Sequence, residues 1–123
     1  MVKIIVGGQI DKQEIANLIK EIGGNEVEVE IKSDLSAANT LKKEEADYYI
    51  GACNTGGGGA LAMAIAILGR NNTAAVSTPG NILSEEKIIK EVRAGKKAFG
   101  FTAQHKEIII PILINEMLAQ NKE

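Results

Sequence analysis

Four consecutive glycines, at positions 56–59, separate a strand-like apolar segment from a helix-like apolar segment. Glycine loses more backbone entropy on folding than any other residue, so such a run indicates a backbone that takes positive φ or approaches another group closely. The pattern predicts a buried strand over residues 47–52 and a helix over residues 60–68, buried on more than one side. A strand, a glycine-rich turn and a helix amino terminus together predict an anion-binding site, because unpaired N–H groups and the helix dipole favour negative charge.

The rest of the chain has the pattern of one alternating α/β domain, residues 1–123. Five helices are predicted to alternate with five strands, which cover residues 2–6, 26–31, 47–52, 73–77 and 97–101. Asp11, Ser33, Ser84 and Thr102 have the character of helix N-caps, and Asp11 with Glu14 forms a capping-box pattern. In the second helix Leu35, Ala38 and Leu41 are expected to face inward, residues 78–83 are expected to form a loop, and Pro111 predicts a kink or a restart in the last helix.

This alternation predicts a single Rossmann-like three-layer domain, in which a five-stranded parallel sheet has helices on both faces. We expect the strand order 2-1-3-4-5, with the alternating strand 26–31 at one edge. In such sheets ligands bind beyond the carboxyl ends of the strands, at the switch point between the first and third strands. The glycine-rich segment is expected to lie at this point.

Several polar and glycine residues follow strands and should gather at this edge. Cys53 precedes a helix amino terminus, where a thiol becomes more acidic and can act as a base or nucleophile; a small buried hydrophobe is the alternative interpretation. His105 is either part of the site or an ordinary first-turn helix residue. The predicted catalytic residues are Cys53 and Thr55, and the predicted ligand-binding residues are Gly8, Gln9, Asn54, Gly56, Gly57, Gly58, Gly59, Thr78 and His105.

Both arginines, Arg70 and Arg93, follow predicted helices and should lie at the opposite edge of the sheet. An anion at the predicted site would then be held by backbone N–H groups, by Thr55, and by Lys106 or a neighbouring subunit. We predict no metal site, because one cysteine and one histidine far apart in sequence are a poor ligand set. No cofactor motif is present.

Composition limits the other partners. With 14 basic and 16 acidic residues the net charge is −2, which gives no basic field for nucleic acid. The longest apolar run is far shorter than the ~20 residues that span a bilayer. A single cysteine fits a reducing compartment, and with no signal-peptide pattern the protein is expected to be cytoplasmic. The apolar helix 60–68 and the isoleucine-rich stretch 108–114 favour a homo-oligomer.

Two family resemblances follow from these motifs. Asp47-Tyr-Tyr-Ile-Gly-Ala-Cys-Asn-Thr-Gly, the glycines, Ala60-Leu61, Pro79-Gly80 and Ala98-Phe-Gly100 resemble the YhfU family of small bacterial proteins over nearly the whole chain. This family has no established activity, so the resemblance implies a relationship without a mechanism.

The second resemblance is more distant. Cys53-x-Thr55-Gly56-x-Gly58-x-Ala60-Leu61-Ala62 is similar to a loop of the ribose-5-phosphate isomerase B and galactose-6-phosphate isomerase family. The resemblance implies a Rossmann-like fold, Cys53 as the base that moves a proton between adjacent carbons, and Thr55 with glycine amides steadying the enediolate. This chain departs from the family at Gly7-Gly8-Gln9, where an Asp-His pair stands, and it has no phosphate-binding arginines at the predicted edge.

Three functions follow as hypotheses. The first is a protein that binds a small anionic or sugar-phosphate-like ligand at the 53–59 loop, with isomerase-like chemistry at Cys53. The second is a non-catalytic accessory or regulatory subunit. The third is a phosphocysteine carrier, which is disfavoured because the cysteine of such carriers follows the first strand and Cys53 follows the third.

Overall fold

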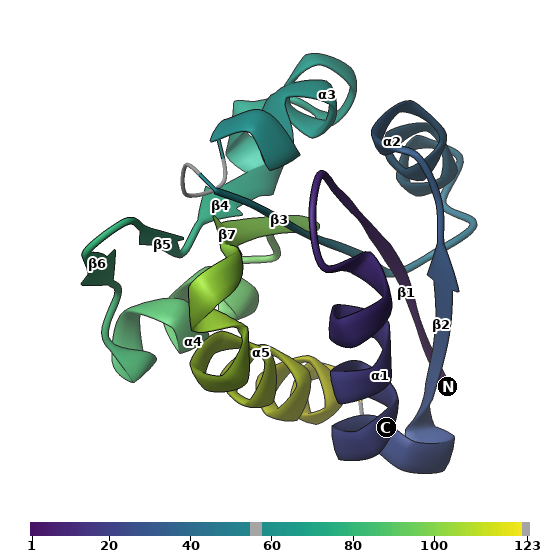
Figure 1. Ribbon diagram of the computed structural model, residues 1–123. Helices are drawn as coiled ribbons and strands as arrows, with labels where there is room; N and C mark the ends of the chain where they lie inside the picture. Colours follow the sequence, from purple (N-terminus) through teal and green to yellow (C-terminus); the bar gives the residue numbers. More distant parts are fainter. Residues whose placement is uncertain (55–57, 122–123) are drawn as a thin grey trace.

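The computed structural model describes residues 1–54 and 58–121 (Figure 1). Within them, five parallel strands form one sheet in the order β2-β1-β3-β7-β4, and β5 and β6 form a separate hairpin. The strands are β1 (Val2–Gly8), β2 (Val27–Ile31), β3 (Tyr48–Cys53), β4 (Thr73–Ala75), β5 (Ser77–Thr78), β6 (Asn81–Ile82) and β7 (Ala98–Thr102). The helices are α1 (Lys12–Gly23), α2 (Asp34–Lys42), α3 (Gly58–Leu68), α4 (Glu85–Arg93) and α5 (Lys106–Gln120).

The helices cover both faces of the sheet, which confirms the predicted three-layer α/β fold. Helices α2 and α3 pack side by side on one face, while α1 and α4 flank α5 on the other (Figure 1). The direction of each connection explains this division. The chain moves one way across the sheet through α1 and α4 and the other way through α2 and α3, and crossovers of one hand then place the two pairs on opposite faces.

The predicted strand order is correct for the first three strands, whereas the last two are exchanged. Strand β7 pairs with β3 on one side and with β4 on the other, so β4 forms the edge. Every residue of β7 is buried, whereas the short strand β4 leaves Ala75 exposed. A strand without solvent-exposed residues gains most from a central position, since both of its faces and both of its edges are then covered.

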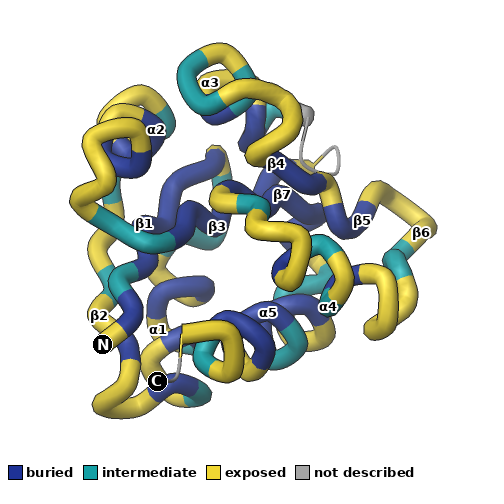
Figure 2. Tube along the Cα trace, turned by 180° about the vertical axis from the view of Figure 1, so that it is seen from behind, coloured by how far each residue is buried: buried dark blue, intermediate teal, exposed yellow. Residues whose placement is uncertain are grey.

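Alternate residues of the central strands supply two separate cores. Ile4, Ile50 and Phe99 face α1, α4 and α5, and their neighbours Ile5, Tyr49 and Ala98 face α2 and α3. The first core contains 22 of the described buried residues and the second only 7. Figure 2 shows the buried sheet between helices whose outer sides are exposed. The layer formed by α2 and α3 is therefore the more thinly packed of the two.

Two of the four helix-cap predictions are wrong, whereas Ser84 caps α4 as predicted by accepting a hydrogen bond from the Lys87 N–H. Asp11 precedes α1 with φ 59° and its side chain makes no capping hydrogen bond. Thr102 belongs to β7, and α5 begins after His105. Ser33 does cap α2 by accepting a hydrogen bond from the Ser36 N–H, but Leu35, predicted to face inward, is 53% exposed. Strand register and loop contacts take priority over local cap preference at these ends.

The segment predicted as a loop, residues 78–83, includes part of a β-hairpin. Strand β4 ends at Ala75, and the chain then pairs Ser77 with Ile82 and Thr78 with Asn81 around Pro79 and Gly80. Gly80 has φ 77°, which suits the third position of a type II turn after proline.

Two predictions about the apolar helices need correction. Helix α3 buries Ala60, Leu61 and Ala64, but Met63 is 43% exposed, so in this single chain α3 is buried on one side only. Helix α5 runs through Pro111 as one element, without the restart. In the stretch 108–114 the side chains of Ile109, Ile110, Leu113 and Ile114 are fully buried and belong to the core. Only Ile108 of these isoleucines is exposed, so this stretch no longer supports an oligomer contact.

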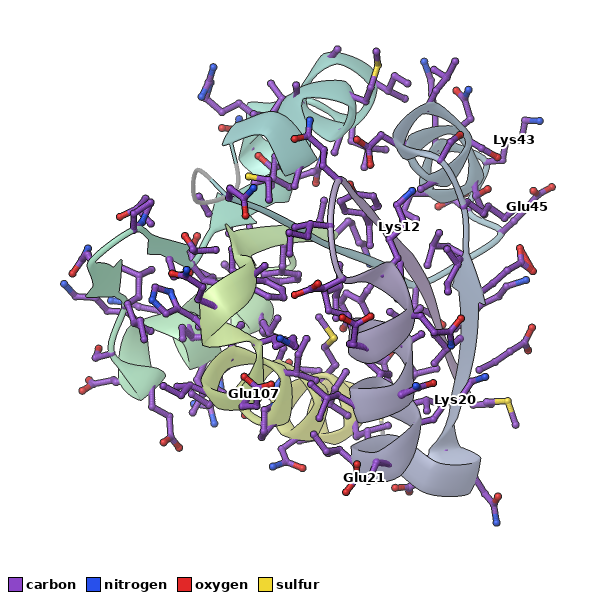
Figure 3. The ribbon with its side chains drawn as sticks, viewed as in Figure 1. Lys12, Lys20, Glu21, Lys43, Glu45 and Glu107 are labelled. Atoms are coloured by element: carbon purple, nitrogen blue, oxygen red, sulfur yellow. The ribbon has the colours of Figure 1, made fainter. Side chains whose placement is uncertain are left out.

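Charged side chains occupy the outer helix surfaces. Figure 3 shows Lys20 and Glu21 on the outer side of α1, and Lys43 and Glu45 beyond the end of α2. Within residues 1–54 and 58–121, no helix has the length and apolarity needed to cross a membrane.

One buried carboxylate makes fold stability depend on pH. Glu116, 9% exposed, accepts hydrogen bonds from Arg93 Nε at 3.0 Å and Gln120 Nε2 at 2.8 Å. The hydrogen bond from Arg93 lowers the pKa of Glu116, against the opposing effect of burial. A carboxyl group with a lowered pKa stabilises the fold above its unfolded-state pKa, and this contribution is lost as pH falls through the folded-state pKa.

We therefore expect the wild-type protein to lose more stability than the Glu116→Gln variant between about pH 6 and about pH 3. Urea unfolding midpoints measured across this range test the expectation. Parallel curves for the two proteins would contradict it.

Candidate functional site

The carboxyl edge of the sheet brings together residues from two strands and one helix. Gly8 lies opposite Ala52 in the register of β1 and β3, and the Gln9 N–H donates to the Ala52 carbonyl at 2.9 Å. The Gln9 side chain lies against Gly59, since a Cβ built on Gly59 would be 3.0 Å from Gln9 Nε2. Gly8, Gln9 and Gly59, predicted to share a site, are therefore neighbours at this edge.

Cys53 ends β3 at the same edge. It is fully buried, and the exposed residue Asn54 follows it in a turn. Gly58 is the first residue of α3. Three predicted site residues, Thr55, Gly56 and Gly57, lie outside the described part of the chain. The thiol thus lies between the end of a central strand and the start of α3, as expected from the sequence order.

Thr102 is a polar residue of this edge that sequence reasoning did not assign to the site. It pairs with Cys53 in the register of β3 and β7, so the two side chains lie on the same face of the sheet. Thr102 is 2% exposed, and its Oγ1 has no hydrogen-bond partner among residues 1–54 and 58–121. A buried hydroxyl without a partner costs free energy, so such a group is a candidate for contact with a ligand or an ordered water.

Thr78 and His105 lie at a neighbouring corner. His105 Nδ1 is 3.0 Å from Ser77 Oγ, which also accepts a hydrogen bond from the Thr102 N–H at 2.9 Å. Thr78 is exposed and forms the next residue of the β5–β6 hairpin. These contacts connect the hairpin and the segment before α5 to the end of β7. Thr78 and His105 therefore lie beside the end of β7, on the side that faces away from β3.

Two residues of the α2 face extend the polar cluster, and sequence reasoning missed both as site residues. Asp34, the first residue of α2, accepts hydrogen bonds at Oδ1 from the Gly8 N–H and the Tyr49 hydroxyl. Tyr49 Oη also lies 2.6 Å from the carbonyl oxygen of Ala60, in the first turn of α3. Gly7 in β1 and Gly51 in β3 carry the signal that could have been used, because glycine inside a central strand often marks a close approach of another group.

Burial raises the pKa of the Tyr49 hydroxyl, and the negative charge of Asp34 raises it further, with a smaller contribution from Cys53. Tyr49 is therefore a neutral hydrogen-bonding group at physiological pH. Tyr49 and Cys53 are four residues apart in β3, so their side chains lie on the same face of the sheet.

Neither arginine of the chain lies near the candidate site. Arg70 precedes β4 and Arg93 is the last residue of α4, so both lie at the amino edge, as predicted. Lys106 begins α5 at the carboxyl edge, where its Nζ lies 3.3 Å from Asp11 Oδ2 and 3.5 Å from Glu107 Oε2. Burial works against the charged form, but both carboxylates together raise the pKa of Lys106. Its charge is thus already paired within the chain.

The concave regions elsewhere are weaker candidates. A groove of about 550 Å³ is lined by Glu85, Glu86, Ile89, Lys90 and Arg93, all from α4. A second of about 380 Å³ lies at the amino edge, between the ends of α2 and α3. The first involves no strand end, and the second adjoins the amino ends of β3, β4 and β7, so neither lies at the carboxyl edge where ligands bind in such sheets. Nor do residues 1–54 and 58–121 contain a cluster of three or more side chains suited to hold a metal ion.

Comparison with known proteins identifies relatives along nearly the whole chain. The model of the family described as "Protein of unknown function DUF2620" matches residues 2–117. The uncharacterised protein YhfU of Escherichia coli K12 is 42% identical over 117 residues, which cover 95% of this chain and 99% of that protein. The uncharacterised protein YhfU of Shigella flexneri matches to the same extent.

Two solved structures share the fold. A ribose 5-phosphate isomerase of the RpiB type from Thermotoga maritima superposes with a TM-score of 0.66 at 14% identity, covering 96% of this chain and 86% of the other. The type B ribose 5-phosphate isomerase of Trypanosoma cruzi gives a TM-score of 0.64 at 16% identity, covering 96% and 83%. At such identities the likeness concerns the fold alone.

Proposed function

The chain belongs to the DUF2620 family of proteins of unknown function, and we propose that it binds a small anionic, sugar-phosphate-like ligand at the 53–59 loop. One observation carries the proposal. Cys53 pairs with Thr102 at the edge of the sheet where α3 starts, and the buried Thr102 hydroxyl has no hydrogen-bond partner among the described residues. The start of a helix favours an anion, and an unpartnered hydroxyl gains a hydrogen bond when a ligand arrives. The start of α3 and the Thr102 hydroxyl would face the same ligand.

The chemistry we propose for this site is proton transfer with Cys53 as the base and Thr55 beside it. Thiolate is favoured near a helix amino terminus, and the fold is that of two ribose 5-phosphate isomerases. The glycine amides and Asn54, Gln9 and Gly59 would contact the ligand, while Thr78 and His105 would approach it from the β7 side. The carrier hypothesis remains disfavoured, because Cys53 ends β3 and the cysteine of such carriers follows the first strand.

We also propose a cytoplasmic homo-oligomer. The exposed apolar residues of the α2–α3 layer, Leu35 and Met63, support an interface there, beside the candidate site. A partner subunit could then supply the positive charge that Lys106 does not offer.

Alkylation of Cys53 tests the catalytic part of the proposal. We expect iodoacetamide to modify Cys53 faster below pH 8 than it modifies free cysteine, because a thiolate is the reactive form. Saturating ribose 5-phosphate should slow the modification at least five-fold by covering the sulfur. Mass spectrometry of the intact protein gives the rate, since Cys53 is the only cysteine in the chain. A slow rate without ligand protection would show an inert, structural cysteine.

The Cys53→Ser variant separates binding from turnover. Loss of aldose–ketose interconversion with ligand affinity retained within about two-fold would support Cys53 as the base. If neither protein interconverts the sugar phosphate while both bind it, the accessory-subunit hypothesis is favoured. The absence of ribose 5-phosphate binding by the wild-type protein in calorimetry would reject the proposed ligand class.

A further inference from the structure

The Tyr49 side chain occupies a space that two glycines leave open. A Cβ on Gly7 would lie 2.5 Å from Tyr49 Cε2, and a Cβ on Gly51 would lie 2.7 Å from Tyr49 Oη. Both distances are too short for any side chain, so only glycine is compatible with the ring in this position. Glycine in a central strand weakens the strand, and two of them here show that the position of Tyr49 is maintained at some cost to stability.

The hydroxyl of Tyr49 joins three elements. It lies 2.9 Å from Asp34 Oδ1 at the start of α2 and 2.6 Å from the carbonyl oxygen of Ala60 in α3, while the ring itself belongs to β3. A neutral phenol has only one proton to donate, so the Asp34 carboxylate and the Ala60 carbonyl share it at this junction. The Gly8 N–H of β1 donates to the same Asp34 oxygen. These contacts fix the orientation of the Asp34 carboxylate.

Only one of the two carboxylate oxygens takes part in these contacts. No hydrogen bond among residues 1–54 and 58–121 uses Asp34 Oδ2, and Asp34 is half-buried. An ionised carboxylate offers about four acceptor positions and no donor. A carboxylate that is held in place at a ligand-binding edge and keeps acceptor capacity is suited to bind a hydroxyl group.

The position of Asp34 relates it to the candidate site. Gly8, which it contacts, lies opposite Ala52, the residue before Cys53, and Tyr49 reaches the first turn of α3. A phosphate group beside Asp34 would be repelled by its charge, whereas the start of α3 favours an anion. The two ends of the site thus prefer different groups: an anion near α3 and a hydrogen-bond donor near Asp34.

We propose that Asp34 binds a hydroxyl group of the ligand, with Tyr49 as its positioning residue, and that the site therefore selects polyhydroxylated phosphates over simple anions. This inference rests on the proposed function. It adds the residue that recognises the sugar-like end and predicts the direction in which the ligand lies, from α3 towards β1.

Calorimetry on the full chain with two probes, ribose 5-phosphate and inorganic phosphate, tests the inference. The Asp34→Asn variant should bind ribose 5-phosphate about ten-fold more weakly, because a charge-assisted hydrogen bond is replaced by a neutral one. Its affinity for inorganic phosphate should stay within two-fold of wild type. Tyr49→Phe should weaken ribose 5-phosphate binding about three-fold with the same selectivity, since the carboxylate loses its support.

Asp47 provides a matched control. Its carboxylate also accepts a backbone N–H of β1, from Lys3 at 2.8 Å, but precedes β3 at the amino edge. Asp47→Asn should leave both affinities unchanged. Equal weakening by Asp34→Asn and Asp47→Asn, or equal weakening of both probes by Asp34→Asn, would overturn the inference by indicating a general loss of structure. An Asp34→Asn variant that binds ribose 5-phosphate as wild type does would overturn it and leave the proposed function standing.

A comparison of ligands avoids substitution altogether. Glycerol 3-phosphate and propyl phosphate have the same three-carbon chain and differ by two hydroxyl groups. The wild-type protein should bind glycerol 3-phosphate several-fold more tightly. Equal affinities would reject hydroxyl recognition, whereas binding of neither compound nor ribose 5-phosphate would reject the proposed function together with the inference.

Discussion

Replacing Gly8 by alanine is expected to lower the free energy of unfolding by about 3 to 5 kcal/mol, from backbone strain and overpacking together. Gly8 has φ 86°, a conformation that side chains rarely adopt. Its Cβ would also lie 2.5 Å from the Ala52 nitrogen and 2.6 Å from the Ala52 oxygen. Backbone atoms of a central strand cannot rotate away as a side chain can, so the β1–β3 pairing itself must shift.

Gly95 is the matched control for this experiment. It has φ 90° but its Cβ would meet no atom within 4 Å. Gly95→Ala therefore isolates the cost of positive φ, about 1 to 2 kcal/mol. Urea unfolding of both variants gives the difference, which measures the close approach of β1 to β3. Equal losses would mean that the clash at Gly8 is relieved without cost.

Truncating Phe99 to alanine is expected to cost about 3 to 5 kcal/mol, the usual range for a fully buried phenylalanine. Phe99 lies in β7 between β3 and β4, is fully buried, and its ring centroid is 6.3 Å from that of Tyr48. The loss would leave a cavity in the larger core, against α4 and α5. Such a cost is expected of a central strand and would be unusual for a strand at the edge.

Ile108→Ala provides the comparison, because Ile108 is a large apolar residue that lies mostly in solvent and outside the proposed interface. Its expected effect is within about 0.5 kcal/mol. Thermal and urea unfolding of the two variants report the contrast. A small loss for Phe99→Ala would argue against the central position of β7.

The exchange of the last two strands shows where sequence patterns stop being informative. The periodicity of the apolar residues, together with the turn residues, predicted the strands, the helices and their alternation. Strand order depends instead on which strand is most apolar and on which face the helices can cover, and both are properties of the whole sheet. The cue was present: residues 98–102 contain one polar side chain, whereas residues 73–77 contain two. Strands that are consecutive in the chain are more commonly neighbours in the sheet, but this is only a tendency.

The site was predictable to a similar degree. Gly8, Gln9, Cys53 and Gly59 follow or precede elements whose ends meet at one edge, so chain order was enough to group them. Asp34 follows the second strand and was expected at the same edge but not in the site, because its contact with Tyr49 crosses 15 positions of sequence. Such a pairing depends on the side chain passing over two glycines in neighbouring strands, which no local pattern records.

Because the two cores differ in size, the two helix layers are expected to differ in their stability against local unfolding. Helices α2 and α3 rest on the smaller set of buried residues, so the free energy needed to lift them from the sheet is lower than for α1, α4 and α5. The proposed site lies beneath these two helices, so we expect a ligand to reach the buried sulfur by local opening of this layer. Tyr49 is the residue that stabilises this layer against opening, since its hydroxyl connects both α2 and α3 to β3.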